Sequence, residues 1–232
     1  MSETLQLAVV LVPCLVVAIV FHEVAHGWAA LALGDPTAKE KRRLSLNPIR
    51  HVDPVGTLLV PGALALFGGP IFGWAKPVPV TYSRLNNPRL GMMAVAAAGP
   101  GTNFLLAVLG AVAIGLFGLV DQVTAQFVTI PGVEPSLLAT GLAYFVLINV
   151  FIGVFNLLPI PPFDGSHIVG GLLPKSWSVH WQKLQALGML LFVVLIAATW
   201  AFPQADWIGG IVLPPVFWVL DQFLSLARAI AG

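Results

Sequence analysis

Charged residues are scarce in this sequence. Of its 232 residues, only 9% are Asp, Glu, Lys or Arg, whereas 58% are hydrophobic and the mean hydropathy is +0.92. A soluble domain carries about 25% charged residues, because it must cover a water-facing surface. The scarcity therefore excludes an ordinary water-soluble domain and predicts that lipid is the solvent for most of the surface.

Cysteine and excess charge are also nearly absent. Cys14 is the only cysteine, so no internal disulfide can form and the fold does not depend on an oxidising compartment. The formal net charge is +1 and no basic patch is interleaved with aromatic residues, so we expect no nucleic-acid partner. The P-loop and Rossmann signatures are missing as well, so we expect no nucleotide site.

Long apolar runs are what the sequence does contain. A membrane-spanning helix needs about 20 predominantly apolar residues. Five stretches qualify or nearly qualify as spans: 5–33, 90–120, 137–158, 184–200 and 208–226. The first of them lacks a basic leader and is too long for a signal peptide, so we expect it to stay in the mature protein. A sixth stretch, 55–72, is shorter and is broken by glycine and proline, so we expect it to re-enter the membrane, buried by its neighbours.

The positions of the basic residues predict the orientation. All eleven Lys and Arg residues fall after the first span, after 55–72, after the third span or at the end of the last one. If 55–72 re-enters, all of them lie on one side, which the positive-inside rule makes the cytosol. We therefore predict an outside N-terminus and a cytosolic C-terminus. If 55–72 spans fully, the basic residues no longer all lie on one side of the membrane.

Two short polar stretches could form a small sheet at the membrane surface. Residues 38–46 and 75–82 alternate in polarity and contain β-formers, and an edge of such a sheet could pair with an extended peptide. Plain surface loops are an equally good interpretation. The predicted fold class is thus an all-α integral membrane protein with about five transmembrane helices, a re-entrant segment and a small membrane-surface β element. It forms one domain, 1–232, with a catalytic core at about 5–170 and C-terminal helices at about 184–227.

The first span carries the motif that points to chemistry. His22, Glu23 and His26 form H-E-V-A-H, and positions i and i+4 share one face of a helix. Both imidazoles can then bind one metal ion, while the adjacent Glu reaches a metal-bound water and acts as general base. Three ionisable residues within a span are expensive and by default functional. The motif predicts a zinc hydrolase.

Two histidines leave a catalytic zinc short of a third protein ligand. Asp164 directly follows the third span, which by this topology ends at the same side and depth as the first. The prolines at 159, 161 and 162 break the helix there, so the carboxylate can turn back toward the metal. From spacing alone, a helix cap or turn residue is a comparable interpretation of this Asp.

These motifs together resemble the site-2 protease family of intramembrane zinc metalloproteases. The resemblance rests on H-E-V-A-H at 22–26 and N-L-L-P-I-P-P-F-D-G at 156–165. It is supported by G-P-G-T-N at 99–103, by the stretch 44–61 and by G-W-A-K-P-V-P-V at 73–80. Residues 44–61 and 73–80 are similar to the compact bacterial members, and no stretch is long enough for a PDZ domain.

The resemblance implies an activity and a set of site residues. It implies that His22, His26 and Asp164 hold one Zn²⁺ per chain and that Glu23 activates the zinc-bound water. It suggests Asn156 and Asn103 as groups that position or polarise the scissile segment, although a buried Asn bonding a neighbouring helix is comparably good. The implied substrate is a transmembrane protein or peptide. The implied location is the bacterial plasma membrane, with the active site toward the cytosol. The sequence leaves the oligomeric state open.

Other interpretations stay open at this stage. His51 and Asp53 could line the site or serve an ordinary loop, and His167 could support the metal ligands. A transporter would also place His, Glu and Asp inside broken spans. A scaffold without activity would not need Glu23 beside both histidines.

Overall fold

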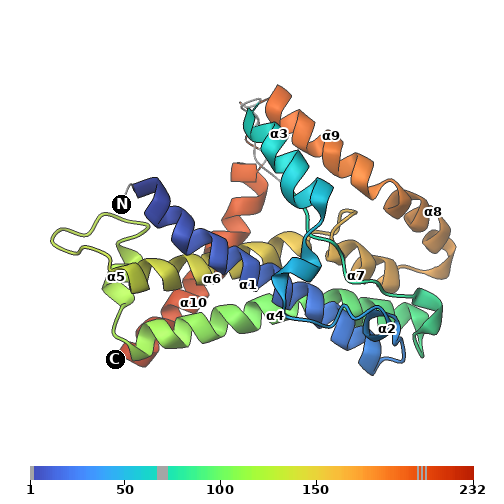
Figure 1. The fold of residues 1–232 in the computed structure, drawn as a ribbon, viewed down its shortest axis with the longest axis horizontal. Coiled ribbons are helices and arrows are strands. Elements are labelled where there is room, and N and C mark those ends of the chain that lie inside the picture. Colours follow the sequence, from blue (N-terminus) through green and yellow to red (C-terminus); the bar gives the residue numbers. More distant parts are fainter. Residues whose placement is uncertain (1–2, 67–72, 203, 205, 207) are drawn as a thin grey trace.

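The structure is a computed structural model that describes residues 3–66, 73–202, 204, 206 and 208–232 (Figure 1). Helices account for the regular structure in these ranges. The longer helices are α1 (Glu3–Ala32), α4 (Pro88–Leu116), α6 (Leu137–Asn156), α8 (Lys175–Ala186), α9 (Gly188–Ala201) and α10 (Leu213–Ala231). The shorter ones are α2 (Thr37–Glu40), η1 (Pro48–His51), η2 (Pro54–Leu59), α3 (Val60–Leu66), η3 (Tyr82–Arg84), α5 (Val120–Thr124), α7 (Asp164–Leu172) and η5 (Ile208–Val212).

Four helices in the described ranges are long and apolar enough to cross a membrane, and they make this an integral membrane protein. They cover Leu7–Ala32, Pro88–Leu116, Leu137–Asn156 and Gly209–Ala231. On α4, small residues face inward, whereas Leu105 and Leu109 are more than half exposed. Such an outward apolar face is stable only against lipid. Four of the predicted spans are therefore confirmed.

The predicted span at 184–200 differs from the structure. Here α8 and α9 are bent by 58° at a short break, so the pair counts as a fifth span only if the two pieces are taken together. The reason lies in the sequence of α8, K-S-W-S-V-H-W-Q-K-L-Q-A, which is polar on one face. A polar face favours a position along the membrane surface over a straight crossing.

The described part of the predicted re-entrant segment is helical and short. Residues 54–59 form η2 and residues 60–66 form α3, and neither is among the candidate spans. The rest of that segment, 67–72, lies outside the described residues. Asp53 caps η2 by accepting hydrogen bonds from the N–H groups of Val55 and Gly56, at 3.0 and 2.7 Å.

The predicted membrane-surface β element is wrong for the described residues. Residues 38–40 belong to helix α2, residues 41–47 are irregular, and residues 75–81 are extended without pairing to another strand. Pro77 and Pro79 explain the second case, because proline has no N–H to donate to a ladder. The expected sheet edge is a single extended segment.

The main core lies between α4, α6 and α10. On α10 the buried residues are Val216, Leu220, Leu224 and Ala227, a spacing of three to four that marks one helix face. On α4, glycine and alanine allow close approach: a side chain at Gly110 would meet Val146 of α6 at 2.6 Å. Small residues at helix contacts are typical of membrane proteins.

Both chain ends lie at the same end of this helix assembly (Figure 1). Helix α4 runs antiparallel to α1, since Val95 near its start contacts His26 near the end of α1. The end of α10 returns beside the end of α4, where Gly115 lies against Ala227 and Ile230. The sequence predicted termini on opposite sides of the membrane, whereas the end of α10 lies at the same end of the assembly as the start of α1.

Candidate metal centre

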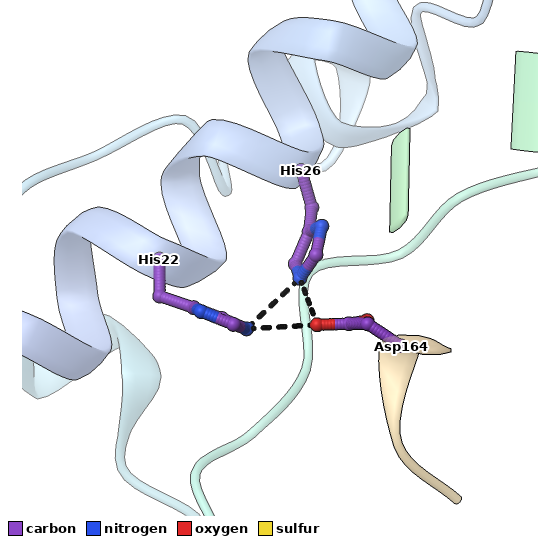
Figure 2. Close-up of side chains that lie close together, drawn as sticks. All are labelled: His22, His26 and Asp164. Atoms are coloured by element: carbon purple, nitrogen blue, oxygen red, sulfur yellow. Dashed lines mark hydrogen bonds and ion pairs between the residues drawn. The ribbon is translucent and has the colours of Figure 1, made fainter. Parts of the chain in front are cut away.

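Helix α1 presents both histidines of H-E-V-A-H to one point (Figure 2). The Nε2 atoms of His22 and His26 lie 3.1 Å apart, and the two rings are 89° to one another. The i, i+4 spacing puts the two side chains on the same face of the helix. His22 is 7% exposed, so this point lies inside the protein.

Asp164 brings a carboxylate to the same point from a different element (Figure 2). It is the first residue of α7, and its Oδ2 lies 3.2 Å from His22 Nε2 and 3.3 Å from His26 Nε2. The next residue is Gly165, where a Cβ would collide with the backbone carbonyls of Leu157 and Leu158. Glycine at this position therefore lets α7 begin close against the end of α6 and turns Asp164 inward.

The other ring nitrogens of both histidines are held by acceptors. His22 Nδ1 lies 2.7 Å from Asn103 Oδ1, and His26 Nδ1 lies 2.7 Å from the Val95 carbonyl. The Asn103 amide is oriented by its Nδ2, which donates to the Ala18 carbonyl and to Asn149 Oδ1. Each histidine thus carries its proton on Nδ1 and directs the lone pair of Nε2 at the shared point.

Three acceptor atoms therefore converge, and a cation satisfies all of them at once. Without a cation, the two imidazoles would need protons on Nε2. Burial opposes ionisation of Asp164, but the facing imidazoles have the larger effect and lower the pKa of Asp164 to about 2. With Nδ1 already protonated, two such protons would place two imidazolium ions 3.1 Å apart. Moreover, Asp164 Oδ2 is buried and has no hydrogen-bond partner among the described residues.

The dimensions of the cluster fit zinc. The three ligand atoms are separated by 3.1, 3.2 and 3.3 Å. Tetrahedral ligands at zinc distances of about 2.0–2.1 Å are about 3.3 Å apart. Within the described residues, His22, His26 and Asp164 are the group of His, Cys, Asp and Glu side chains that could hold a metal ion. Two imidazoles and a carboxylate with a fourth position open are typical of catalytic zinc.

Gly99 of G-P-G-T-N makes room for the imidazoles. A Cβ there would lie 2.5 Å from the His26 ring and 2.7 Å from the His22 ring. A side chain at position 99 would displace the cluster, so glycine there lets the two helices approach each other. The motif thus contributes both the gap, at Gly99, and the partner of His22, at Asn103.

Glu23 lies beside the cluster at the edge of an apolar cleft. Its Oε2 accepts a hydrogen bond of 2.7 Å from the N–H of Val78. The cleft has a volume of about 620 Å³ and is reached by His22, Glu23 and Asn156. Its other walls are mainly aliphatic and aromatic side chains of α1, α6, α9 and α10, among them Phe151, Phe155, Phe192 and Phe217.

The two asparagines suggested by the sequence lie in different places. Asn156 lines the cleft, although its Nδ2 donates to the Ile152 carbonyl one turn back. Asn103 is fully buried behind His22, and both protons of its amide are in use. This geometry favours substrate contact for Asn156 and orientation of His22 for Asn103.

The three remaining candidates are not part of the group that could hold the metal ion. His51 is buried and uses Nε2 to bond the Ser45 carbonyl, at 2.7 Å. Asp53 caps η2. His167, one turn beyond Asp164 on α7, contacts Gln185 and lines a polar cavity of about 560 Å³; burial lowers its pKa.

Sequence reasoning missed Asn149, Val95 and Val78. Asn149 is a polar residue in the middle of an apolar span, which is a signal that could have found it. The contributions of Val95 and Val78 come from backbone groups, which no side-chain pattern indicates.

Comparisons with known proteins agree with this geometry. The sequence profile described as Peptidase family M50 matches residues 10–198. The chain is 37% identical over 234 residues to the protein named "Putative zinc metalloprotease YwhC" of Bacillus subtilis (strain 168), covering 97% of this chain and 94% of that protein. No solved structure gave a significant match.

Two mycobacterial proteins with the same style of name are more distant. Rip2 of Mycolicibacterium smegmatis is 28% identical over 195 residues, which cover 80% of this chain and 67% of that protein. Rip3 of Mycobacterium tuberculosis is 30% identical over 135 residues, which cover 54% of this chain and 30% of that protein.

Proposed function

The chain belongs to peptidase family M50 and is a zinc metalloprotease of that family, and from this premise we propose that it cuts peptide bonds within or near the transmembrane segments of membrane proteins. The ligands of one zinc ion per chain would be His22, His26 and Asp164. Glu23 would be the general base.

The observation that carries this proposal is the convergence of three acceptor atoms beside a carboxylate. The ligand atoms of His22, His26 and Asp164 lie within 4.8 Å of one another, inside a protein with four candidate spans. Glu23 neighbours His22 in the chain and opens onto the same cleft. A nucleophile generated there would meet a substrate away from bulk water.

The residues of the chain have separate tasks in this mechanism. A zinc ion held by His22, His26 and Asp164 would supply a Lewis acid for the scissile carbonyl and would make water acidic enough to deprotonate near neutral pH. Glu23 takes the proton of the attacking water and returns it to the leaving amine. Asn156, which lies on the wall of the cleft, would bond the scissile segment. Asn103 and the Val95 carbonyl keep the imidazoles oriented.

The cleft supports a substrate of apolar sequence. Its walls are aliphatic and aromatic, and the polar groups gather where His22, Glu23 and Asn156 reach it. An apolar segment gains free energy by leaving water for such walls, whereas a charged peptide would lose its hydration there. A helix must unwind locally in the cleft, because helical amides are bonded internally.

We also propose that the end of the assembly bearing the metal centre faces the cytosol of a bacterial cell. The Lys and Arg residues of 39–50, 76–89 and 175–183 gather at that end. The N-terminus would lie outside, and so would the C-terminus, which is found at the same end. A reporter fused after Arg89 should be cytosolic; an outside reading would overturn this orientation.

Proteolysis can be tested with a Glu23→Gln variant. The probe is a set of single-span proteins with fluorescent tags at both ends, reconstituted with the enzyme in liposomes. Wild type should separate the tags of at least one of them, and E23Q should cut it at least about 10³-fold more slowly, because the general base is lost. E23Q should keep its zinc, since Glu23 is not among the three ligands.

Glu40→Gln is the matched control, because Glu40 is an exposed carboxylate paired with Arg84 at the surface. It should cleave like wild type. Wild-type cleavage by E23Q would refute the role of Glu23, and absence of cleavage by wild type across the whole set would count against the proposed substrate class.

A further inference from the structure

An extended segment, Gly73–Thr81, runs past the metal centre, and we call it the strap. It connects the region of η1 and η2 with the end of α1. Its sequence is G-W-A-K-P-V-P-V-T, and its conformation is extended without forming a strand. The strap has no role in the mechanism so far.

The first end of the strap is fastened to the 51–57 region. The N–H of Trp74 donates to the Gly56 carbonyl at 3.1 Å, and the Thr57 hydroxyl donates to the Trp74 carbonyl at 2.9 Å. The N–H of Lys76 donates to the His51 carbonyl at 2.8 Å. Residues 51–57, H-V-D-P-V-G-T, therefore have a structural role, because they hold the strap in place.

The middle of the strap reaches the catalytic carboxylate. The N–H of Val78 donates to Glu23 Oε2 at 2.7 Å, and Val78 is only 7% exposed. Arg43, which is largely buried, donates from Nη2 to the Lys76 carbonyl at 2.7 Å. The Val78 N–H therefore bonds one oxygen of Glu23 and leaves the other for the attacking water.

The far end of the strap is tied to Asp35, just beyond α1. Asp35 is fully buried and accepts from the Thr81 N–H at 2.5 Å and from the Thr37 N–H and hydroxyl. The Thr37 hydroxyl also contacts the Thr81 hydroxyl at 2.8 Å. Glu23 lies on α1 and Asp35 lies just beyond the end of that helix. The hydrogen bonds to Asp35 therefore fix the position of the strap along α1.

Between residues 76 and 79 the strap has no free backbone donor. Between 76 and 79 the backbone carries two N–H groups, those of Lys76 and Val78, because Pro77 and Pro79 have none. Both are taken, by the His51 carbonyl and by Glu23. A substrate strand would find only carbonyl groups along this stretch, whereas a β-ladder needs donors and acceptors in alternation.

We propose that the strap is a positioning device for Glu23: its Val78 N–H fixes the carboxylate for proton transfer. The catalytic role of Glu23 rests on the function proposed above, but the contact between Glu23 and the strap does not. Fixing the base matters because small misplacements of a catalytic group cost about 10²-fold in rate.

The contact can be tested without any substrate by comparing Glu23→Ala with Glu23→Gln. Glutamine keeps an acceptor oxygen for the Val78 N–H, and alanine removes it. In detergent, hydrogen–deuterium exchange of peptides covering 73–81 should be about tenfold faster in E23A than in wild type and near wild type in E23Q. Equal exchange in all three proteins would overturn the proposal, whether or not the protein proves to be a protease.

The positioning role is tested with Val78→Pro, which removes the N–H, against Val80→Pro. Val80 lies in the same strap, and its N–H has no bond to any residue that the structure describes. With a single-span substrate that wild type cleaves, V78P should lower kcat about 10- to 100-fold at similar KM and unchanged zinc content, and V80P should lower kcat much less.

Equal losses in the two variants, or a rise in KM rather than a fall in kcat for V78P, would contradict positioning. If V78P does not fold, the exchange measured in E23A and E23Q decides.

Discussion

The candidate metal centre has a helix-borne half and a loop-borne half, and the two are fixed by different means. His22, Glu23 and His26 lie on one face of α1, where helix geometry alone brings the imidazoles together. The loop-borne half consists of the strap and of Asp164, which is the first residue of α7 and directly follows the irregular segment 157–163; glycine and individual hydrogen bonds place both.

This difference shows where the site is robust and where it is adjustable. A helix in a membrane cannot change its register without losing its internal hydrogen bonds, so the relative position of His22 and His26 is rigid. The position of Asp164 depends on the packing of Gly165 against Leu157, and that of Glu23 depends on the strap. Substitutions in each half should therefore fail in different ways.

The largest effect is expected from removing the loop-borne ligand. Asp164→Ala leaves two imidazoles and no negative charge, so zinc affinity should fall more than about 100-fold, beyond the loss that is typical of outer-shell changes. Competition with a chelator measures this affinity. The control is Asp121→Ala, an exposed carboxylate on α5. Unchanged affinity in D164A would show that the helix half alone holds the metal.

A smaller effect on zinc affinity is expected from removing the hydrogen bond that orients His22 on the side away from the metal. Asn103→Leu removes the acceptor of His22 Nδ1 inside the core, so the imidazole can rotate and zinc affinity should fall about 10- to 100-fold. Asn149 contacts the amide of Asn103 rather than His22 itself, so Asn149→Leu should lower zinc affinity less than Asn103→Leu does. A greater loss in N149L than in N103L would contradict this order.

The smallest effect on the metal is expected at Asp35, where the strap is tied. Asp35→Ala leaves three donors without their acceptor and should lower stability by about 1–3 kcal/mol, seen as a lower thermal midpoint. Zinc affinity should stay at the wild-type level, because no ligand contacts Asp35. The matched control, Glu40→Ala, removes an exposed partner of Arg84 and should change little.

The two halves also differ in how far the sequence predicts them. H-E-V-A-H predicts a shared metal point because residue spacing and helix geometry suffice. Asp164 needed the resemblance to the family as well, since its spacing alone fits a helix cap equally well. The four straight spans were predictable from apolar length, as the structure confirms.

What the sequence did not predict depends on packing and on backbone groups. The bend between α8 and α9 follows from how an amphipathic helix meets its neighbours. The predicted β element failed because Pro77 and Pro79 stop the extended segment from pairing. The Val78 N–H that reaches Glu23 leaves no trace in any side-chain pattern.

The central claim is that His22, His26 and Asp164 form a zinc site, and the metal content of the detergent-purified protein tests it most directly. Wild type should contain about one zinc per chain, and His22→Ala, purified in parallel, should contain almost none. No zinc in folded wild type after incubation with zinc, or the same zinc content in H22A, would contradict the account.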